Sequence, residues 1–390
     1  MLRVFTLIFS LSVLSLSVAA QTIIPAPPQI AATAYLLIDA DSGRVIVEHN
    51  ADESLGPASL TKMMTSYVLS YEEAKGNVSS DDQVLISENA WSQNPVFAGS
   101  SLMWIEVGKR VALSDLHRGI VISSGNDASV AVAEHIAGSE SAFADIMNQH
   151  AALLGMNDTH YVNAHGLPDP DHYTTARDLA KLAQAIIKQF PEDYRMYSER
   201  EFTFNNIRQY NRNTLMAEDA TVVGLKTGHT SEAGYCLVAS AKRQGMRLIS
   251  VVLGASSERA RKRESKKLLS YGFRFYQTQK LYAAGQQIDD VKVWKGLSDK
   301  LGLGVADEIY LTVPRGRLDD LKASTIIDNV ITAPISQSQQ VGFLRVTLDG
   351  DIVTERPLLA LQAVEEAGFF ARLWDQVVLW FSQMFGRGGQ

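Results

Sequence analysis

The sequence predicts an α+β protein whose larger body is followed by a small all-β unit and a terminal helix. Three observations support this fold class: strand patterns open the chain after residue 34, helical periodicity fills the middle, and strand patterns return after residue 220. Strands, an all-helical block, then strands with a closing helix indicate packed layers rather than alternating βαβ units. With 390 residues the chain is long enough for two domains.

Residues 1–20 are predicted to be a signal peptide rather than part of the fold. A short positive region precedes the apolar run VFTLIFSLSVLSLSV, and small residues before Gln21 are typical of a cleavage site after Ala20. An uncleaved anchor is the alternative, although the apolar run is short for a membrane span. The mature chain is therefore expected to be exported.

Residues 21–280 are predicted to form the first domain, which begins with strands and continues with helices. Residues 34–50 read as a β-hairpin around Asp41, Ser42 and Gly43, and a helix follows near Ser59. Further helices are expected at 113–122, from Asn126, at 141–156 and at 174–190, the last capped by Thr174 or Thr175. Three strands at 221–230, 233–243 and 246–255 and a closing helix at 261–278 complete the domain.

Residues 281–366 are predicted to form a small β-rich domain, and residues 367–390 a membrane-anchoring segment. Short β-like runs occupy 291–296, 308–316, 321–327 and 342–360. Within 369–385, aromatic and aliphatic residues gather on one half of a helical wheel, with Leu379 as an exception on the polar half. A helix docked on its own protein is one interpretation. The crowding of aromatic residues favours a helix lying in the membrane interface.

Composition excludes several classes of function. The net charge of −7 argues against nucleic-acid binding, which needs a basic surface. Cys236 is the single cysteine and lies in an apolar strand pattern, so we expect a buried thiol and no disulfide. The eight histidines show no metal-binding spacing, so neither zinc nor another cofactor is expected.

Ser59 and Lys62 are candidate catalytic residues, because a serine and a lysine three residues apart share one face of a helix. One interpretation is that Ser59 caps the helix and Lys62 is a surface residue. Two further short motifs decide against it: Ser124-Gly125-Asn126 in the break between two helices, and Lys226-Thr227-Gly228 in a strand. In this order and on these elements, the three motifs resemble the active-site pattern of the penicillin-binding protein and serine β-lactamase superfamily.

Each of these residue types has a physical reason to be there. Lys62 can accept the proton of the Ser59 nucleophile if burial and a second cation, Lys226, depress its pKa. The backbone N–H groups of Ser59 and His229 can form an oxyanion hole. Ser124 can relay a proton between the lysines and the leaving amine, and Asn126 can hold the substrate amide. Lys226 and Thr227 can bind a substrate carboxylate, while Gly125 and Gly228 allow close backbone approach.

Over essentially its whole length the chain resembles the low-molecular-mass D-alanyl-D-alanine carboxypeptidases of Gram-negative bacteria, the penicillin-binding protein 5 and 6 group. The resemblance is carried by segments that include NADESLGPASLTKMMTSYV, ISSGNDASVAVAEHIAGS, HYTTARDLAKLA, EFTFNNIRQYNRN, GLKTGHTSEAGYCLVAS and VEEAGFFARLWD. It implies a β-lactamase/transpeptidase-like catalytic domain, a β-rich stalk and an amphipathic anchor at the outer face of the inner membrane, in the periplasm.

The resemblance also implies a reaction. The terminal D-alanine of peptidoglycan stem pentapeptides is removed through an acyl-enzyme on Ser59, in cell wall biogenesis and remodelling, and β-lactams acylate the same serine. An arginine that helps to bind the substrate carboxylate matches Arg261, and residues 93–104 match a loop beside the active site.

Three other functions stay open at this point. A β-lactamase of class A needs a glutamate in an E-x-x-L-N context, which this sequence lacks. A D,D-endopeptidase shares the three motifs, but members with that role generally lack the C-terminal domain. A non-catalytic wall-binding protein needs a broken motif, whereas all three are intact.

Overall fold

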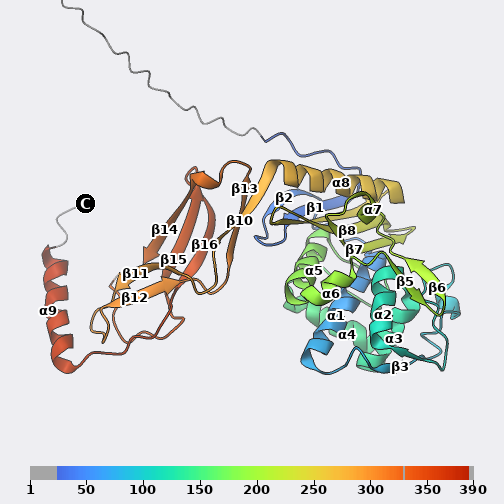
Figure 1. Cartoon of the computed structure of the whole chain (residues 1–390), viewed down its shortest axis with the longest axis horizontal. Helices are drawn as coiled ribbons and strands as arrows, with labels where there is room; N and C mark the ends of the chain where they lie inside the picture. The colour runs from blue at the N-terminus through green and yellow to red at the C-terminus, as the bar shows by residue number, and fades with distance from the viewer. Residues whose placement is uncertain (1–23, 328–329, 386–390) are drawn as a thin grey trace, which may run out of the picture.

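The computed structural model describes residues 24–327 and 330–385 and places them in two bodies and a terminal helix (Figure 1). The predicted signal peptide lies outside the described residues. The larger body holds the central sheet and most helices, the smaller body is all-β, and helix α9 lies at the far end of the smaller body (Figure 1). This arrangement confirms the α+β fold class with its added β-rich unit and terminal helix.

A five-stranded antiparallel sheet forms the centre of the larger body, in the order β2-β1-β9-β8-β7. Its strands are β1 (Ala34–Asp39), β2 (Val45–His49), β7 (Val222–Thr230), β8 (Gly234–Arg243) and β9 (Met246–Ala255). The predicted hairpin and the predicted turn at Gln244-Gly245 are both present. Because β7 is an edge strand, one side of it is left to face the helical block.

Helix α8 (Glu258–Phe275) lies along one face of this sheet, on top of the larger body in Figure 1. Ser257 caps it by accepting a hydrogen bond from the backbone N–H of Ala260, so it starts before the predicted residue 261. It also ends earlier than the predicted residue 278. From Tyr276 the chain becomes strand β10 (Tyr276–Tyr282), which pairs with β13 (Ile309–Pro314) of the smaller body, so strand pairing prevails over helical periodicity here.

The helical block covers the other face of the sheet. It consists of α1 (Lys62–Lys75), α2 (Leu113–Arg118), α3 (Asn126–Ala137), α4 (Glu140–Leu153), α5 (Ala176–Gln189) and α6 (Pro191–Met196). The short helix α7 (Leu215–Glu218) packs instead on the α8 side of the sheet, where Glu218 pairs with Lys262 and Lys266. The predicted helix at 113–122 is present, but its second half is a π-helical turn, Gly119–Ser123. Two small two-stranded sheets were not predicted: β3 (Gln83–Leu85) with β4 (Arg110–Ala112), and β5 (Glu201–Phe204) with β6 (Ile207–Tyr210).

The smaller body is built on a second five-stranded sheet, in the order β11-β12-β16-β15-β14. Its strands are β11 (Gln287–Lys292), β12 (Lys300–Gly304), β14 (Leu321–Ile327), β15 (Gln340–Leu348) and β16 (Asp351–Ala360), while β13 pairs with β10 in a separate two-stranded sheet. Alternate side chains such as Leu301, Leu303 and Val346 are fully buried in their own core. The sequence missed β12, whose two glycines weaken its strand pattern.

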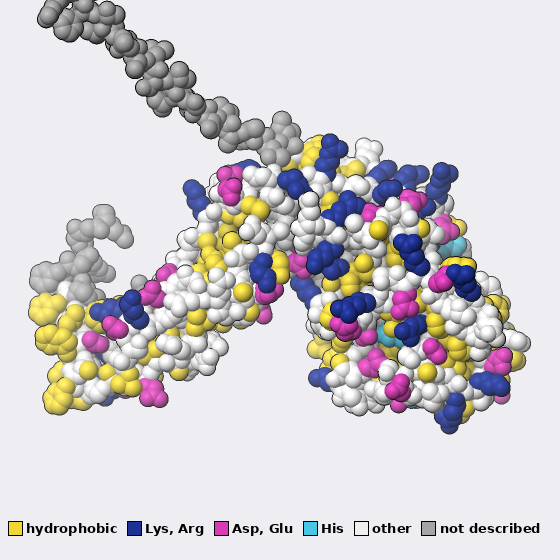
Figure 2. Space-filling view, in the orientation of Figure 1, with side chains coloured by type: hydrophobic (Ala, Val, Ile, Leu, Met, Phe, Trp, Pro, Cys, Tyr) yellow, Lys and Arg dark blue, Asp and Glu magenta, His cyan; other side chains and the backbone are white. Residues whose placement is uncertain are grey.

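Helix α9 (Phe369–Phe385) has the predicted bounds and presents its apolar face outward. Phe370 is 83% exposed and Trp374 69% exposed, and Figure 2 shows hydrophobic side chains gathered on this end of the molecule. The other face meets the β-rich body, where Leu379 is buried and the Asp375 carboxylate accepts a hydrogen bond from the backbone N–H of Lys295 at 2.6 Å. Within the described residues, no helix is long and apolar enough to cross a bilayer.

Candidate active site

Ser59 and Lys62 lie where the chain enters helix α1. Ser59 belongs to a 3-10 turn (Ala58–Thr61) directly before the helix, and Lys62 is the first residue of α1. The Nζ atom of Lys62 lies 3.2 Å from the hydroxyl oxygen of Ser59. Lys62 is only 1% exposed, and the Ser59 side chain makes no capping hydrogen bond. The interpretation of Lys62 as a surface residue is therefore wrong.

Two strong acceptors orient the amine of Lys62. Its Nζ donates to Oδ1 of Asn126 and to the backbone carbonyl of His165, both at 2.6 Å. With two hydrogens held there, the third direction of a tetrahedral nitrogen is left for Ser59. Burial lowers the pKa of Lys62 from 10.5 to about 7, against the opposing effect of the Asp127 carboxylate. At neutral pH a large share of Lys62 is therefore an uncharged amine facing the Ser59 hydroxyl.

Ser124 and Asn126 project into the site from the break between α2 and α3. The π-helical turn ends at Ser124, which has left-handed backbone angles, with φ at 65°. A non-glycine residue adopts this region only at a cost, which the surrounding packing has to offset. The turn redirects the chain so that α3 can begin at Asn126. Both side chains are buried, 2% and 3% exposed, and face Lys226 and Lys62 respectively.

Strand β7 brings a second lysine–serine pair into the same site. The Nζ atom of Lys226 donates to the Ser124 hydroxyl at 2.9 Å and to the backbone carbonyl of Thr227 at 3.1 Å. Burial, together with the positive charge of Lys62, holds the pKa of Lys226 well below its usual range. The sequence predicted that Lys226 would lower the pKa of Lys62. Burial is the main cause of the lowered pKa of both lysines, and their mutual repulsion disfavours the state in which both are charged.

Two glycines allow these elements to approach closely. A Cβ atom on Gly228 would lie 3.0 Å from the Pro57 carbonyl oxygen and 3.2 Å from Cβ of Ala58, so β7 passes directly against the turn that carries Ser59. A Cβ atom on Gly125 would lie 2.8 Å from a carboxylate oxygen of Asp127. Both are tighter than ordinary side-chain contacts. The predicted close approach at Gly125 and Gly228 is therefore confirmed.

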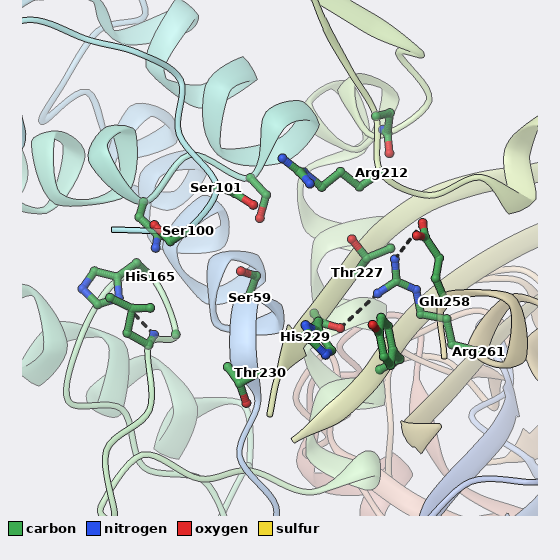
Figure 3. Close-up of a pocket in the computed structure, with 18 of the residues that line it drawn as sticks. Ser59, Ser100, Ser101, His165, Arg212, Thr227, His229, Thr230, Glu258 and Arg261 are labelled. Carbon is green, nitrogen blue, oxygen red and sulfur yellow. Dashed lines mark hydrogen bonds and ion pairs between the residues drawn. The ribbon is translucent and has the colours of Figure 1, made fainter. Parts of the chain in front are cut away.

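His229 and Arg261 flank the end of β7. The exposed imidazole of His229 stacks on Tyr235, with ring centroids 3.9 Å apart. The guanidinium of Arg261, from α8, donates to the Gly228 carbonyl at 3.1 Å and lies 3.4 Å from the Glu258 carboxylate, as the dashed lines in Figure 3 show. Both residues line the cavity, but the Nη1 atom of Arg261 also fixes the strand.

Most of these residues line one cavity of about 570 Å3, and the buried amines of Lys62 and Lys226 contact its lining residues Ser59 and Ser124. In Figure 3, Ser59 lies at its centre, between Ser100, Ser101 and His165 on one side and Thr227, His229 and Arg261 on the other. The predicted loop 93–104 contributes Gly99, Ser100 and Ser101 to the lining. The site is thus a hollow between the edge of the central sheet and the helical block, with the Ser59 hydroxyl at its floor.

Sequence reasoning missed three residues that shape this cavity. Arg212 is exposed in the lining, beside Thr227 in Figure 3, and its Nε donates to the Ser123 carbonyl at 3.3 Å. His165 supplies the carbonyl that holds Lys62. The buried Asp127 carboxylate accepts hydrogen bonds from the backbone N–H groups of residues 103–105 and so fixes the loop. The run GNDA contains Asp127, but nothing local in the sequence reveals these distant partners.

A serine facing a buried lysine, with a second lysine–serine pair across the same cavity, defines the class of active-site-serine, penicillin-binding enzymes. Residues 21–257 match the family model of D-alanyl-D-alanine carboxypeptidase, and residues 276–366 match that of the penicillin-binding protein 5 C-terminal domain. The chain belongs to the D-alanyl-D-alanine carboxypeptidase family, and is a serine peptidase of that family.

Named relatives agree with this assignment. The chain is 47% identical over 369 residues to D-alanyl-D-alanine carboxypeptidase DacA of Escherichia coli K12, covering 94% of this chain and 92% of the relative. The crystal structure of penicillin-binding protein 5 from Haemophilus influenzae matches with a TM-score of 0.85 at 41% identity, covering 88% of this chain and 100% of that one. Penicillin-binding protein D2 from Listeria monocytogenes, in its cefotaxime-bound form, matches with a TM-score of 0.58 at 28% identity, covering 64% and 100%.

Proposed function

We propose that this chain is a D-Ala-D-Ala carboxypeptidase that cleaves the terminal D-alanine from peptidoglycan stem peptides through an acyl-enzyme on Ser59. One observation carries the proposal: two buried lysine amines each lie within 3.2 Å of a serine hydroxyl in the same cavity. The Lys62–Ser59 pair is placed to activate the attacking oxygen, and the Lys226–Ser124 pair is placed to protonate the departing amine. Family membership supplies the substrate class.

In acylation, Ser59 Oγ attacks the carbonyl carbon of the penultimate D-alanine while neutral Lys62 takes its proton. The tetrahedral intermediate collapses by breaking the C–N bond. The leaving nitrogen needs a proton, which the Ser124 hydroxyl donates. Lys226 then donates a proton to Ser124. D-Alanine leaves as an amine, and the rest of the peptide stays as an ester on Ser59. Asn126 holds the Lys62 amine at 2.6 Å throughout and is placed to hold the substrate amide.

The developing oxyanion needs donors that are in place before the reaction. The first N–H groups of a helical turn have no intrahelical partner, so that of Ser59 is available. Strand β7 lies at the sheet edge, where alternate N–H groups have no neighbouring strand, and the His229 N–H is the proposed second donor.

A carboxyl-terminal substrate also needs positive charge at the cavity wall. Thr227, Lys226 and Arg261 are the proposed carboxylate partners, and Arg212 adds a fourth group on the same cavity. Burial makes Lys226 give up its proton readily in the free enzyme. An entering carboxylate favours the charged form, so substrate binding restores the proton that the relay then uses.

Hydrolysis of the acyl-enzyme reuses the same groups. Before hydrolysis, the proton that Lys62 took passes to Lys226, which gave one up, and Ser124 is the proposed relay. Water then attacks the ester carbon, and neutral Lys62 accepts the water proton and delivers it to Ser59 Oγ, which leaves as its hydroxyl. A β-lactam presents an amide bond to the same serine, but its leaving nitrogen remains tethered after the ring opens. β-Lactam antibiotics therefore act as covalent inhibitors that occupy Ser59.

The chain is further proposed to act in the periplasm, after removal of residues 1–20, on the outer face of the inner membrane. Helix α9 supports this localisation because it docks through its polar side and leaves Phe370, Trp374 and Trp380 exposed. A helix that only packed on its own protein would bury these aromatic rings instead. Such an outward apolar face suits the headgroup region of a bilayer.

The reaction is tested by incubating the purified chain without residues 1–20 and 367–390 with a peptide ending in D-Ala-D-Ala. Free D-alanine should be released by the wild type and not by Ser59→Ala. A fluorescent penicillin should label the wild type alone. Penicillin trapping without D-alanine release would refute the carboxypeptidase proposal and favour crosslinked peptides as substrate.

A further inference from the structure

Three potential metal ligands converge on the helical block, away from the residues that line the active-site cavity. They are Glu73 near the end of α1, His117 in α2 and Asp193 in the first turn of α6. One donor atom of each lies within 4.8 Å of the donor atoms of the other two. His117 is only 3% exposed, and both carboxylates are partly buried. A buried imidazole and two half-buried carboxylates from three different helices therefore meet at one point.

The two carboxylates of this cluster have no ion-pair partner in the part of the chain that the structure describes. Among residues 24–327 and 330–385, no hydrogen bond or ion pair is made by the carboxylate of Glu73 or of Asp193. Two carboxylates that face each other in a partly dry site are costly unless a cation joins them.

The imidazole of His117 is prepared to act as a ligand. The ring is buried in α2 and is held by a polar partner. Its Nε2 atom lies 2.7 Å from the Ser66 hydroxyl of α1. Histidines that bind metals characteristically donate one ring N–H to such a partner, which fixes the ring and leaves the other nitrogen for the ion.

We propose that Glu73, His117 and Asp193 form a binding site for a divalent transition-metal ion of the Zn2+ type. One nitrogen and two carboxylate oxygens suit Zn2+ better than Mg2+ or Ca2+, which prefer oxygen ligands alone. In a tetrahedral site with bonds of about 2.1 Å, ligand atoms lie about 3.4 Å apart, so the three donor atoms, which lie within 4.8 Å of one another, would need to close in by no more than about 1.4 Å. With three protein ligands, water completes the coordination.

The proposed ion would act on stability rather than on the reaction. It would join α1, α2 and α6, and none of its three ligands lines the active-site cavity. Ser66 follows Lys62 by one turn of α1, so the ion would brace the helix that carries the catalytic lysine. An ion that binds the folded chain but not the unfolded chain raises the melting temperature of the protein.

The test uses the purified chain, freed of metal with a chelator, and Zn2+ as the chloride salt. The wild type should bind one equivalent by calorimetry and melt several degrees higher with Zn2+ than without it. Glu73→Gln and Asp193→Asn should each weaken this binding at least tenfold and abolish the thermal shift. Both variants remove charge but keep shape, and losing an unpaired carboxylate should not prevent folding.

Glu192→Gln is the matched control, because Glu192 neighbours Asp193 but is exposed and paired with Arg195. It should retain the zinc affinity and the thermal shift of the wild type. A Co2+-loaded wild type should also show visible ligand-field absorption that Glu73→Gln lacks. No Zn2+-dependent shift in the wild type, or equal affinity in wild type and Glu73→Gln, would overturn the site.

Discussion

Acylation of Ser59 should depend steeply on pH, because its proposed base is a lysine whose pKa is lowered to about 7. Only the uncharged amine can take the hydroxyl proton. With a pKa of about 7, the neutral fraction of Lys62 is near one at pH 9, one half at pH 7 and about one hundredth at pH 5. Lowering the pH from 9 to 5 is therefore expected to slow acylation about a hundredfold.

The assay is the second-order rate of fluorescent-penicillin attachment, measured by stopped flow between pH 5 and pH 9. A penicillin lacks the leaving D-alanine, so the rate reports the attack itself. The rate should rise tenfold per pH unit below pH 7 and level off above it. A flat profile would refute Lys62 as the base, and a midpoint near 10 would refute burial as the cause of its lowered pKa.

The same profile measured on Arg212→Gln gives an internal check. The positive charge of Arg212 contributes to the lowering of the pKa of Lys62, although less than burial does. Removing the charge should therefore move the midpoint to higher pH without abolishing the transition. An unchanged midpoint would mean that solvent in the open cavity screens Arg212 completely.

Four further predictions concern single changes to the chain. In the wild type, the free energy of unfolding should rise between pH 7 and 10.5, because Lys62 loses its proton in the folded chain but keeps it in the unfolded chain. Lys62→Met should remove the part of this rise that Lys62 causes. The full effect is about 5 kcal/mol, measured by urea unfolding. Lys226→Ala should slow acylation about a hundredfold while the protein stays folded by circular dichroism; an unfolded variant would contradict its placement as a site lysine. Gly228→Val should cost about 2 kcal/mol of stability and slow acylation at least tenfold, because the new side chain meets the turn before Ser59. Deleting residues 367–390 should end co-sedimentation with anionic vesicles and leave the activity unchanged; vesicle binding that persists would show that another surface contacts the membrane.

The sequence predicted the parts of the fold in which local pattern and tertiary packing agree. The hairpin at 34–50, the three strands from 221 to 255 and helix α9 were all expected within a residue or so of where they lie. The expected end of α8 was wrong because residues 276–278 have a helical pattern but pair with β13. Strand β12 was missed because glycines hide its alternation. In both places a contact made far along the chain decides the structure.

The residues of the candidate site also fall into those that the sequence predicted and those that it did not. Ser59, Lys62, Ser124, Asn126 and Lys226 could be found because each belongs to a short motif of fixed spacing. Arg212 and His165 could not, since one contributes an exposed charge and the other only its backbone carbonyl. The proposed metal ligands were not indicated either, because a search by spacing finds ligands close in sequence, and these come from three separate helices.

The geometry also explains why the site needs a sheet edge beside a helical block. A lysine acts as a base at neutral pH only when it is dehydrated, yet a dehydrated lysine destabilises the fold unless its N–H groups are held. Lys62 meets both conditions because α3 and the His165 loop supply its two acceptors while β7 closes the site from the other side. Gly228 lets β7 come close enough to exclude water, and the left-handed turn at Ser124 brings the second hydroxyl within reach of Lys226. Any change that opens the gap between β7 and α1 should therefore raise the pKa of Lys62 and slow acylation before it measurably destabilises the protein.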